Sequence, residues 1–337
     1  MKRNFLIILL FVSDIVFGQS NLKDQFKVFT IETKDLGVVE FCTFNSSIDK
    51  KKPLLLFIHG SGNEPTFSFR ADQNNYAWKG FLEIQKYKDQ FHVICVNKPG
   101  IPLFDTVQVN PATVETTYPL NDEFINRYSL EWRAESASLI INEALKQLPV
   151  DESKILVIGH SQGGQVAPKV AVLNKKVSHV VLLNSNSLNH LYDFILQERL
   201  AAFTGQQSFE ETQKNIEELY SNYKLIFDDP TSRSKKWNEE TYFRWASFSD
   251  ETPLENMLKL DIPIYVIAGG KDLWGSFIMN TDYVQLEFLR YKKTNLTYKV
   301  YPNANHFLQD EWSENGKTKT VDLKPMIFDE IIKWTNQ

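Results

Sequence analysis

Apolar runs and amphipathic segments alternate along most of the chain. Two runs, at 54–58 and 92–96, are almost entirely apolar, the pattern expected for strands covered on both faces. Further strand-like runs occupy 154–158, 177–183, 264–268 and 296–301, and the segments at 26–31 and 37–44 are expected to pair antiparallel. Apolar residues at helical spacing predict helices at 129–148, 163–173 and 322–334. Strands that alternate with helices predict an α/β fold, with a mostly parallel sheet flanked by helices.

A long segment, residues 189–260, interrupts this alternation. It is rich in Glu, Lys, Tyr and Trp, contains no strand-like run, and has the pattern of several helices, one of them at 209–223. Because it follows a strand of the expected parallel sheet, we expect it to lie over the carboxyl edge, where ligand sites form in such folds. The predicted organisation is therefore a core at 19–188 and 261–337, with a helical cap at 189–260.

The first 18 residues have the features of a secretory signal peptide. Lys2 and Arg3 precede an apolar stretch at 5–12, and a cleavage position falls near Gly18/Gln19. A membrane anchor is the alternative, but the stretch is too short for a bilayer core of about 30 Å, and Asp14 interrupts the apolar character soon after it. We expect an exported protein, periplasmic or extracellular, without a stable membrane anchor after signal cleavage.

Charge and cysteine content narrow the choice of partners. The net charge of −5 offers no basic surface for nucleic acid, and the lysines at 50–52 are expected to form a solvated turn. Export permits a disulfide between Cys42 and Cys95, but both lie in apolar runs, which favours buried free thiols. The sequence has no Cys/His cluster with ligand spacing, so we expect neither a metal nor another cofactor.

The strongest chemical signal is the pentapeptide Gly-His-Ser-Gln-Gly at 159–163, between a strand-like run and a helical segment. A G-x-S-x-G sequence in this context is typical of a nucleophile elbow, a sharp turn that exposes a serine hydroxyl. The turn is so tight that Gly159 and Gly163 are needed on either side of the serine. Ser161 is therefore the candidate nucleophile; the alternative is an ordinary tight-turn serine.

Three further motifs follow predicted strands: His-Gly-Ser-Gly at 59–62, Gly-Gly-Lys-Asp at 269–272 and Asn-His-Phe at 305–307. With the pentapeptide, they resemble the α/β-hydrolase superfamily over nearly the whole chain after residue 18, in particular capped members of the esterase and proline-iminopeptidase-like group. The order Ser, Asp, His also matches that superfamily. A serine nucleophile distinguishes the chain from dehalogenases of this fold, which use aspartate.

The resemblance implies a Ser–His–Asp triad of Ser161, His306 and Asp272. It also implies an oxyanion hole made by the backbone N–H groups of Gln162 and of the loop at Gly60 or Ser61. The His-Gly-Ser-Gly loop departs from the longer H-G-G-G form of many lipases, which leaves the choice between Gly60 and Ser61 open.

Other residues compete for two of these roles. For the base, His190 at the start of the cap is the open alternative to His306. For the acid, Asp261 precedes its strand, and Asp282 lies in a helical segment. Both therefore fit the role less well than Asp272.

The resulting functional hypothesis is a secreted serine hydrolase that cleaves a carboxylic ester or small amide. A peptidase of the same fold and a catalytically silent binding protein are the alternatives. The expected partner is a small-molecule ester or a short peptide. Trp274, two residues beyond Asp272, is the candidate substrate-pocket residue, with packing under the cap as an equal alternative.

Overall fold

The computed structural model describes residues 22–73, 75–78, 82–273, 277–314 and 317–337. The proposed signal peptide and Trp274 lie outside the described residues, so both remain sequence-based predictions. Among the described residues, no helix is long and apolar enough to cross a membrane.

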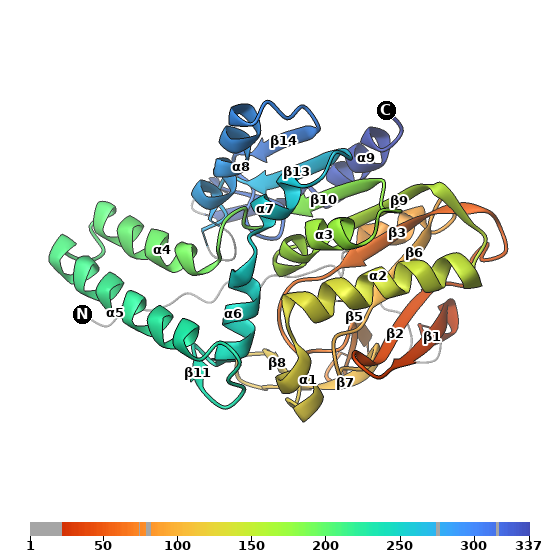
Figure 1. The fold of residues 1–337 in the computed structure, drawn as a ribbon, viewed down its shortest axis with the longest axis horizontal. Helices are drawn as coiled ribbons and strands as arrows, with labels where there is room; N and C mark the ends of the chain where they lie inside the picture. The colour runs from red at the N-terminus through yellow and green to blue at the C-terminus, as the bar shows by residue number, and fades with distance from the viewer. Residues whose placement is uncertain (1–21, 74, 79–81, 274–276, 315–316) are drawn as a thin grey trace.

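An eight-stranded sheet forms the centre of the molecule (Figure 1). Every pair from β6 to β14 in the spatial order is parallel, whereas β2 pairs antiparallel with both β1 and β6. The predicted, mostly parallel α/β sheet is therefore confirmed. The strands in spatial order are β1 (Phe26–Thr33), β2 (Gly37–Phe44), β6 (His92–Val96), β3 (Lys52–Ile58), β9 (Val150–His160), β10 (His179–Leu183), β13 (Ile264–Gly269) and β14 (Leu296–Tyr301).

Helices cover both faces of this sheet because successive strand residues point to opposite sides. Leu54, Leu56 and Ile58 of β3 belong to one hydrophobic core, and Leu55 and Phe57 belong to the other. On the first face lie α2 (Leu130–Gln147), α3 (Gln162–Leu173) and α8 (Ile278–Arg290); on the second lie the 3-10 helix η2 (Leu82–Tyr87) and α9 (Lys324–Trp334).

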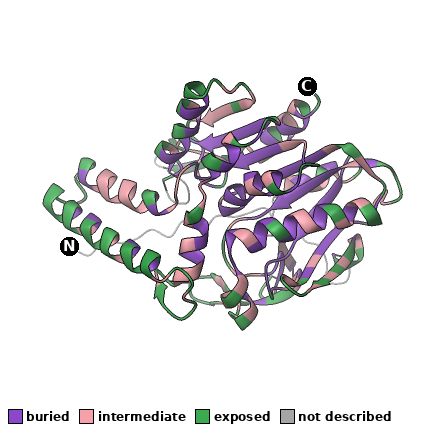
Figure 2. Ribbon diagram, in the orientation of Figure 1, coloured by how far each residue is buried: buried purple, intermediate pink, exposed green. Residues whose placement is uncertain are grey.

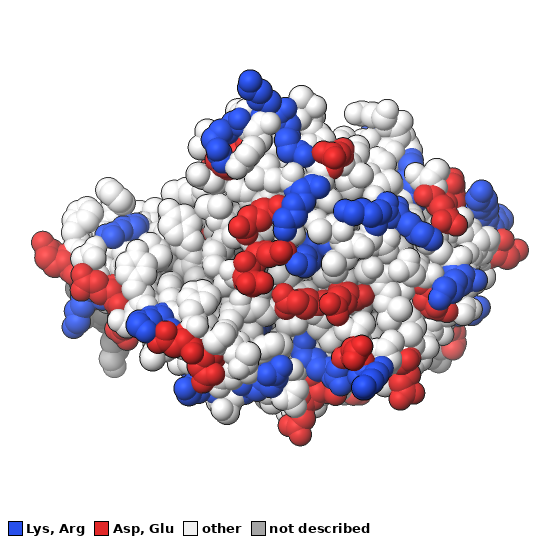
Figure 3. Space-filling view, in the orientation of Figure 1, with Lys and Arg blue, Asp and Glu red and all other residues white. Residues whose placement is uncertain are grey.

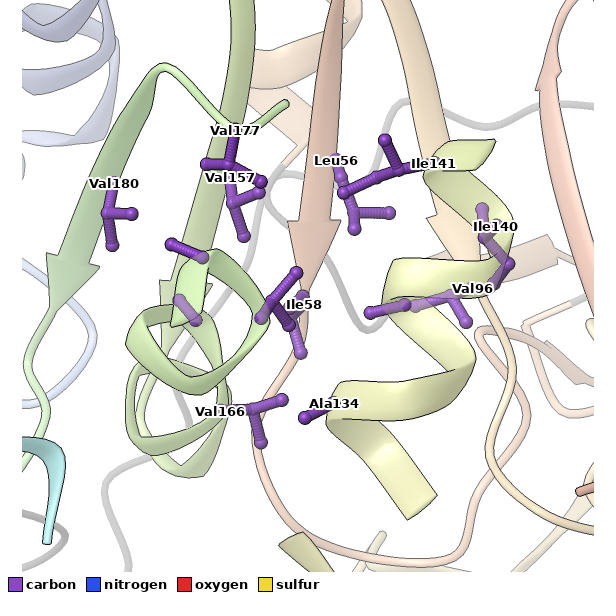
Figure 4. Packing of buried hydrophobic residues seen from close by; sticks show 14 of the residues in the cluster. Leu56, Ile58, Val96, Ala134, Ile140, Ile141, Val157, Val166, Val177 and Val180 are labelled. Atoms are coloured by element: carbon purple, nitrogen blue, oxygen red, sulfur yellow. The ribbon is translucent and has the colours of Figure 1, made fainter. Parts of the chain in front are cut away.

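Helices α2 and α3 pack against each other and against β3, and α3 begins directly after Ser161. Ala134 of α2 and Val166 of α3 meet over β3, beside Leu56 and Ile58 (Figure 4). The N-terminus of α2 is capped by Ser129, whose Oγ accepts a hydrogen bond from the backbone N–H of Trp132 at 3.0 Å. Figure 2 shows that the inner strands of the sheet are buried along most of their length, whereas the edge strands β1 and β14 are largely half-buried or exposed.

Most of the segment at 189–260 projects from the body on the side to which the strand arrows point (Figure 1). It contains α4 (Leu191–Phe203), α5 (Phe209–Asp228), a hairpin of β11 (Lys236–Trp237) and β12 (Glu240–Thr241), α6 (Tyr242–Asp250) and α7 (Pro253–Leu258). Helix α7 packs against α3, and its residues Leu254 and Met257 belong to the core of the first sheet face. The projecting part is thus α4 to α6, which we call the cap.

Several elements were not expected from the sequence. The 3-10 helix η1 (Lys23–Gln25) precedes β1, and α1 (Asp122–Arg127) precedes α2. A second sheet has the order β5-β4-β7-β8, and a hairpin of β15 and β16 follows the Asn-His-Phe motif. These strands are β4 (Phe67–Arg70), β5 (Asn75–Trp78), β7 (Phe104–Val109), β8 (Thr116–Thr117), β15 (Gln309–Glu314) and β16 (Lys317–Asp322).

The expectation of a solvated turn at 50–52 is wrong for Lys52. This residue begins β3 and is 4% exposed. Its Nζ donates to the carbonyl oxygens of Lys88 at 2.8 Å and Ser46 at 3.2 Å, so backbone acceptors replace the water that the ammonium loses. Burial lowers the pKa of Lys52.

Cys42 and Cys95 face each other across the antiparallel pair of β2 and β6, and both are buried free thiols in this structure. Burial and the neighbouring Cys95 raise the pKa of the Cys42 thiol well above its ordinary value. A neutral, buried thiol reacts slowly because the thiolate is the nucleophile.

Candidate active site

Ser161 lies at the turn between β9 and α3 with a left-handed backbone conformation, φ 55° and ψ −127°. Such a conformation is strained for a residue with a side chain, and strain of this kind gathers at functional sites. The backbone N–H of Ser161 donates to the carbonyl of Leu183 at 2.9 Å, which ties the turn to the end of β10.

The glycines around Ser161 are required by close backbone contacts. A Cβ on Gly163 would lie 1.9 Å from the carbonyl oxygen of Ile58, and one on Gly159 would lie 2.1 Å from that of Gly163. A Cβ on Gly164 would lie 2.4 Å from the Cβ of Ser185. These contacts explain the glycine pattern in the sequence, since the helix approaches both neighbouring strands closely.

His306 and Asp272, predicted from two separate motifs, form a hydrogen bond. The distance between Nδ1 of His306 and Oδ2 of Asp272 is 2.7 Å, and their side chains are only 7% and 2% exposed. The carboxylate accepts a hydrogen bond from the Nδ1–H group, and the other ring nitrogen, Nε2, therefore points away from Asp272. An imidazole held in one tautomer by a carboxylate is the arrangement that the predicted base and acid require.

Both loops are held at the carboxyl edge of the sheet by Asn184, which follows β10. Its Nδ2 donates to the carbonyl oxygens of Asn305 and His306, each at 2.8 Å, and its Oδ1 accepts from the backbone N–H of Gly269 at 2.7 Å. A Cβ on Gly269 would lie 2.5 Å from the carbonyl oxygen of Ala304. The Gly-Gly pair before Asp272 thus lets the two loops touch.

The other histidines have different surroundings. His160 lies beside His306, with 5.1 Å between ring centroids, and its Nε2 is 3.1 Å from the carbonyl oxygen of His306. Burial lowers the pKa of His160 to about 3, and the charge of His306 adds to this effect. The neutral ring therefore supports the loop at 305–307 as a hydrogen-bond donor.

His190, the alternative base, lies at the start of the cap. Its ring packs against Phe194 and Trp245, each with 5.7 Å between ring centroids. Burial, together with a smaller effect of the positive charge of Arg244, lowers its pKa to about 4. His190 thus belongs to an aromatic cluster with Phe194 and Trp245. Unlike His306, it has no carboxylate partner among the described residues.

The two alternative acids are remote from His306. The side chain of Asp261 is 99% exposed and pairs with Lys293 at 3.0 Å. Asp282 lies in α8 and accepts a hydrogen bond from the hydroxyl of Tyr298 at 2.6 Å. Of the three candidates, only Asp272 contacts His306 in the described structure.

The loop at 59–62 lies against the serine turn. A Cβ on Gly60 would be 3.1 Å from the Cβ of Ser161 and 3.4 Å from its Oγ. A cavity of about 100 Å³ is lined by His59, Ser61, Gly62, Asn63 and Glu64. Among the described residues, the backbone N–H groups of Ser61 and Gln162 donate to no protein acceptor. For Gln162 this is expected, because it is the first residue of α3.

Three buried cations lie around the ring of Tyr128, the residue that contacts the side chain of Gln162. None of them was predicted from the sequence. The guanidinium carbons of Arg244 and Arg133 lie 4.9 and 5.7 Å from the ring centroid, and Nζ of Lys98 lies 5.5 Å from it. The Tyr128 hydroxyl donates to Oε1 of Gln162 at 2.5 Å. The one sequence feature that could have indicated such a role is the position of Lys98, just after the predicted strand at 92–96.

A second, much smaller cavity, of about 20 Å³, lies between the α1 region and the cap. Leu120, Phe124 and Ile125 line it from the core, and Arg244 with its ion-pair partner Glu240 lines it from the cap. Apolar side chains therefore line one part of this cavity, and charged side chains line another.

No group of three or more His, Cys, Asp or Glu suited to a metal ion occurs in the part of the chain that is described.

Comparisons with solved structures show similarity to three peptidases. Dipeptidyl peptidase 4 of Porphyromonas gingivalis gives a TM-score of 0.51 at 11% identity, over 92% of this chain and 35% of that one. An acylaminoacyl peptidase of Pyrococcus horikoshii gives 0.51 at 13% identity, over 84% and 38%. A puromycin-hydrolysing peptidase of Mycobacterium tuberculosis gives 0.52 at 13% identity, over 84% and 36%.

The chain thus spans little more than a third of the length of these proteins, and a likeness at such low identity shows the fold alone. No curated protein sequence matches the chain significantly. Residues 55–315 match the profile of the alpha/beta hydrolase family. Because this match covers most of the chain, the protein belongs to the alpha/beta hydrolase family.

Proposed function

We propose that the protein is a serine hydrolase that cleaves a carboxylic ester, or a small amide, through an acyl-Ser161 intermediate. The observation that carries this proposal is the strained serine turn at the same sheet edge as the buried His306–Asp272 pair. Peptide cleavage is the alternative, and a silent binding protein on this fold is the alternative of another class.

In the proposed reaction, His306 removes the proton of the Ser161 hydroxyl as Oγ attacks the carbonyl carbon of the substrate. Asp272 holds the imidazole in the required tautomer and stabilises the imidazolium that forms. The tetrahedral intermediate collapses, its bond to the leaving group breaks, and His306 returns the proton to that group. Water then attacks the acyl-serine by the same route and releases the acid.

The negative oxygen of each tetrahedral intermediate needs donors that are free before the reaction starts. The backbone N–H of Gln162 and that of Ser61 fit this need, because neither donates to a protein acceptor among the described residues. One such donor contributes about 3 kcal/mol to transition-state stabilisation. We assign the second donor to the 59–62 loop, as the N–H of either Gly60 or Ser61.

The amino-terminal sequence supports export with cleavage near Gly18/Gln19. The substrate is then a small molecule outside the cytoplasm. Three solved structures of similar fold are peptidases, which makes amide substrates worth testing beside esters.

Labelling with a fluorophosphonate probe tests the nucleophile. We expect the mature wild-type protein to be labelled and Ser161→Ala to fold normally but lose labelling and turnover, with kcat at least ~10³-fold lower. Ser153→Ala, which changes an exposed serine of the same strand β9, is the matched control and should keep full activity. An unlabelled wild-type protein, beside a control hydrolase that reacts, would support the silent binding protein instead.

A substrate panel tests the bond that is cleaved. We expect p-nitrophenyl esters of short acids to turn over faster than N-terminal aminoacyl-arylamides, measured as kcat/KM. The reverse order, with labelling at Ser161 intact, would replace the esterase proposal with the peptidase alternative.

A further inference from the structure

We propose that Lys98 and Arg133 are positioning residues that orient the peptide groups of the 59–62 loop beside Ser161. This inference rests on the proposed serine hydrolase function. It assigns a catalytic contribution to two buried cations that do not touch the reacting atoms.

Lys98 holds the loop from one side. It follows β6, and it is only 2% exposed. Its Nζ donates to the carbonyl oxygen of Gly60 at 2.8 Å and to that of Gly62 at 2.5 Å. One ammonium group therefore binds two peptide groups of a four-residue loop.

Arg133 joins the same loop to the serine turn. This residue of α2 is 4% exposed, and its Nη2 donates to the carbonyl oxygen of His59 at 2.6 Å. Its Nη1 lies 3.4 Å from Oε1 of Gln162 and 3.3 Å from the hydroxyl of Tyr128. The planar guanidinium thus spans from His59 to Gln162, and so connects the loop with the serine turn where the two proposed oxyanion donors lie.

These contacts determine how the loop presents its N–H groups. A trans peptide group is planar, and its C=O and N–H bonds point in opposite directions. The carbonyl of His59 is bound by Arg133, so the N–H of Gly60 points away from that cation. The carbonyl of Gly60 is bound by Lys98, so the N–H of Ser61 points away from Lys98. Neither peptide group can rotate without losing a charge-assisted hydrogen bond.

The cations also make the loop a better donor of hydrogen bonds. A positive charge on the carbonyl oxygen polarises the peptide group, which strengthens hydrogen bonds from its N–H. The hydrogen-bond acceptors of Arg133 in the described chain are neutral: a carbonyl, a phenol and an amide. Its charge therefore remains available to stabilise negative charge that develops near the loop in a water-poor site.

The experiment compares Lys98→Met and Arg133→Lys with wild type, using the mature protein and active enzyme counted by fluorophosphonate titration. Arg133→Lys keeps the positive charge but loses the planar guanidinium that contacts both His59 and Gln162. We choose it because a less conservative substitution of this buried residue could prevent folding. For a short p-nitrophenyl ester, we expect each variant to lower kcat by ~10- to 100-fold while KM stays within about threefold. The affinity for a boronic acid, which forms a tetrahedral adduct with serine, should fall by a similar factor.

Lys52→Met is the matched control. Like Lys98, Lys52 is a buried lysine that donates to two backbone carbonyls. It is the first residue of β3 and so lies at the opposite end of that strand from the 59–62 loop. We expect it to lower stability while leaving kcat and boronic acid affinity per active molecule unchanged.

Three outcomes would overturn the inference. Folded Lys98→Met and Arg133→Lys with wild-type kcat and boronic acid affinity would show that the cations only support the fold. An equal loss of kcat in Lys52→Met would show a general effect of destabilisation. A wild-type protein that neither reacts with the probe nor hydrolyses the esters would overturn the proposed function along with this inference.

Discussion

At the residue scale, a few backbone contacts fix the geometry around Ser161. The serine itself accepts a strained conformation at φ 55°, and the glycines beside it allow the backbones of α3, β3 and β9 to meet. Gly163 is the tightest of these positions, since its Cα faces the carbonyl groups of Ile58 and His59. All the atoms that a Cβ there would meet belong to backbone, which cannot rotate away as a side chain does.

We therefore expect Gly163→Ala to lower the free energy of unfolding by at least about 3 kcal/mol, the upper range for overpacking. Gly205→Ala is the control, because Gly205 has φ +71° but open space around its Cα. This control should cost only about 1 kcal/mol, the cost of a left-handed conformation. Urea denaturation measures both values. A Gly163→Ala protein as stable as Gly205→Ala would contradict the packing argument.

At the element scale, the start of α4 anchors the cap to the core through a buried polar network. Asp193, in the first turn of α4, is 3% exposed. Its Oδ1 accepts from Nδ2 of Asn280 at 2.8 Å, and its Oδ2 accepts from Nδ2 of Asn186. Burial raises the pKa of Asp193 to about 7, although these two hydrogen bonds oppose the rise; the negative charge of Asp272 adds to it.

This raised pKa makes stability depend on pH with a definite sign. The folded protein binds the Asp193 proton more tightly than the unfolded chain, whose pKa is near 3.8. The stabilisation is therefore complete below pH 3.8 and is lost as the pH rises to about 7. Relative to Asp193→Asn, the wild-type free energy of unfolding should fall by roughly 2 to 3 kcal/mol between about pH 5 and pH 8.

Denaturant unfolding at the two pH values checks this expectation. Asp261→Asn, which changes a carboxylate that is 99% exposed, should leave the pH dependence of stability nearly unchanged. A wild-type protein whose stability relative to Asp193→Asn is the same at both pH values would refute a protonated Asp193.

At the scale of the whole molecule, the cap and the second cavity lie on the side of the sheet that carries the serine turn. Helices α4 and α5 project from the body, where α5 is largely exposed and α4 is mostly half-buried (Figures 1 and 2), whereas α6 packs against α2. The hydroxyl of Ser247 in α6 accepts from the backbone N–H of Leu130 at 2.7 Å and donates to Glu131 at 2.6 Å. The cap is thus attached to the core at α6 and at Asp193.

Surface charge on the face drawn in Figure 3 does not indicate a binding site for a large charged partner. Acidic and basic side chains are interspersed over the face drawn in Figure 3, without an extended patch of one sign on that face. The small-molecule substrate stays a proposal, and the absence of a nucleic-acid partner stays a prediction from the net charge of −5.

The sequence by itself determined the main strands of the sheet and the four motifs that lie at or just after the carboxyl ends of β3, β9, β13 and β14. The catalytic roles of Ser161, Asp272 and His306 stay predictions. Strands β6 and β14 both have the predicted bounds. For β6 the physical reason is that a strand buried on both faces is apolar over nearly its whole length, whereas β14 is a half-buried edge strand. The second sheet and the β15–β16 hairpin were missed, because β4, β5 and β8 are short and β15 and β16 are rich in charged and polar residues.

Only the tertiary structure decided what the buried charges do. Lys52 and Lys98 are ordinary lysines in the sequence, yet both are buried because distant backbone carbonyls surround their ammonium groups. Arg133 occupies a helix whose apolar spacing predicts that helix but assigns no role to its guanidinium. The local pattern of apolar and polar residues indicates which segments form helices and strands. The hydrogen-bond partners of a buried charge come from segments that meet only when the chain folds.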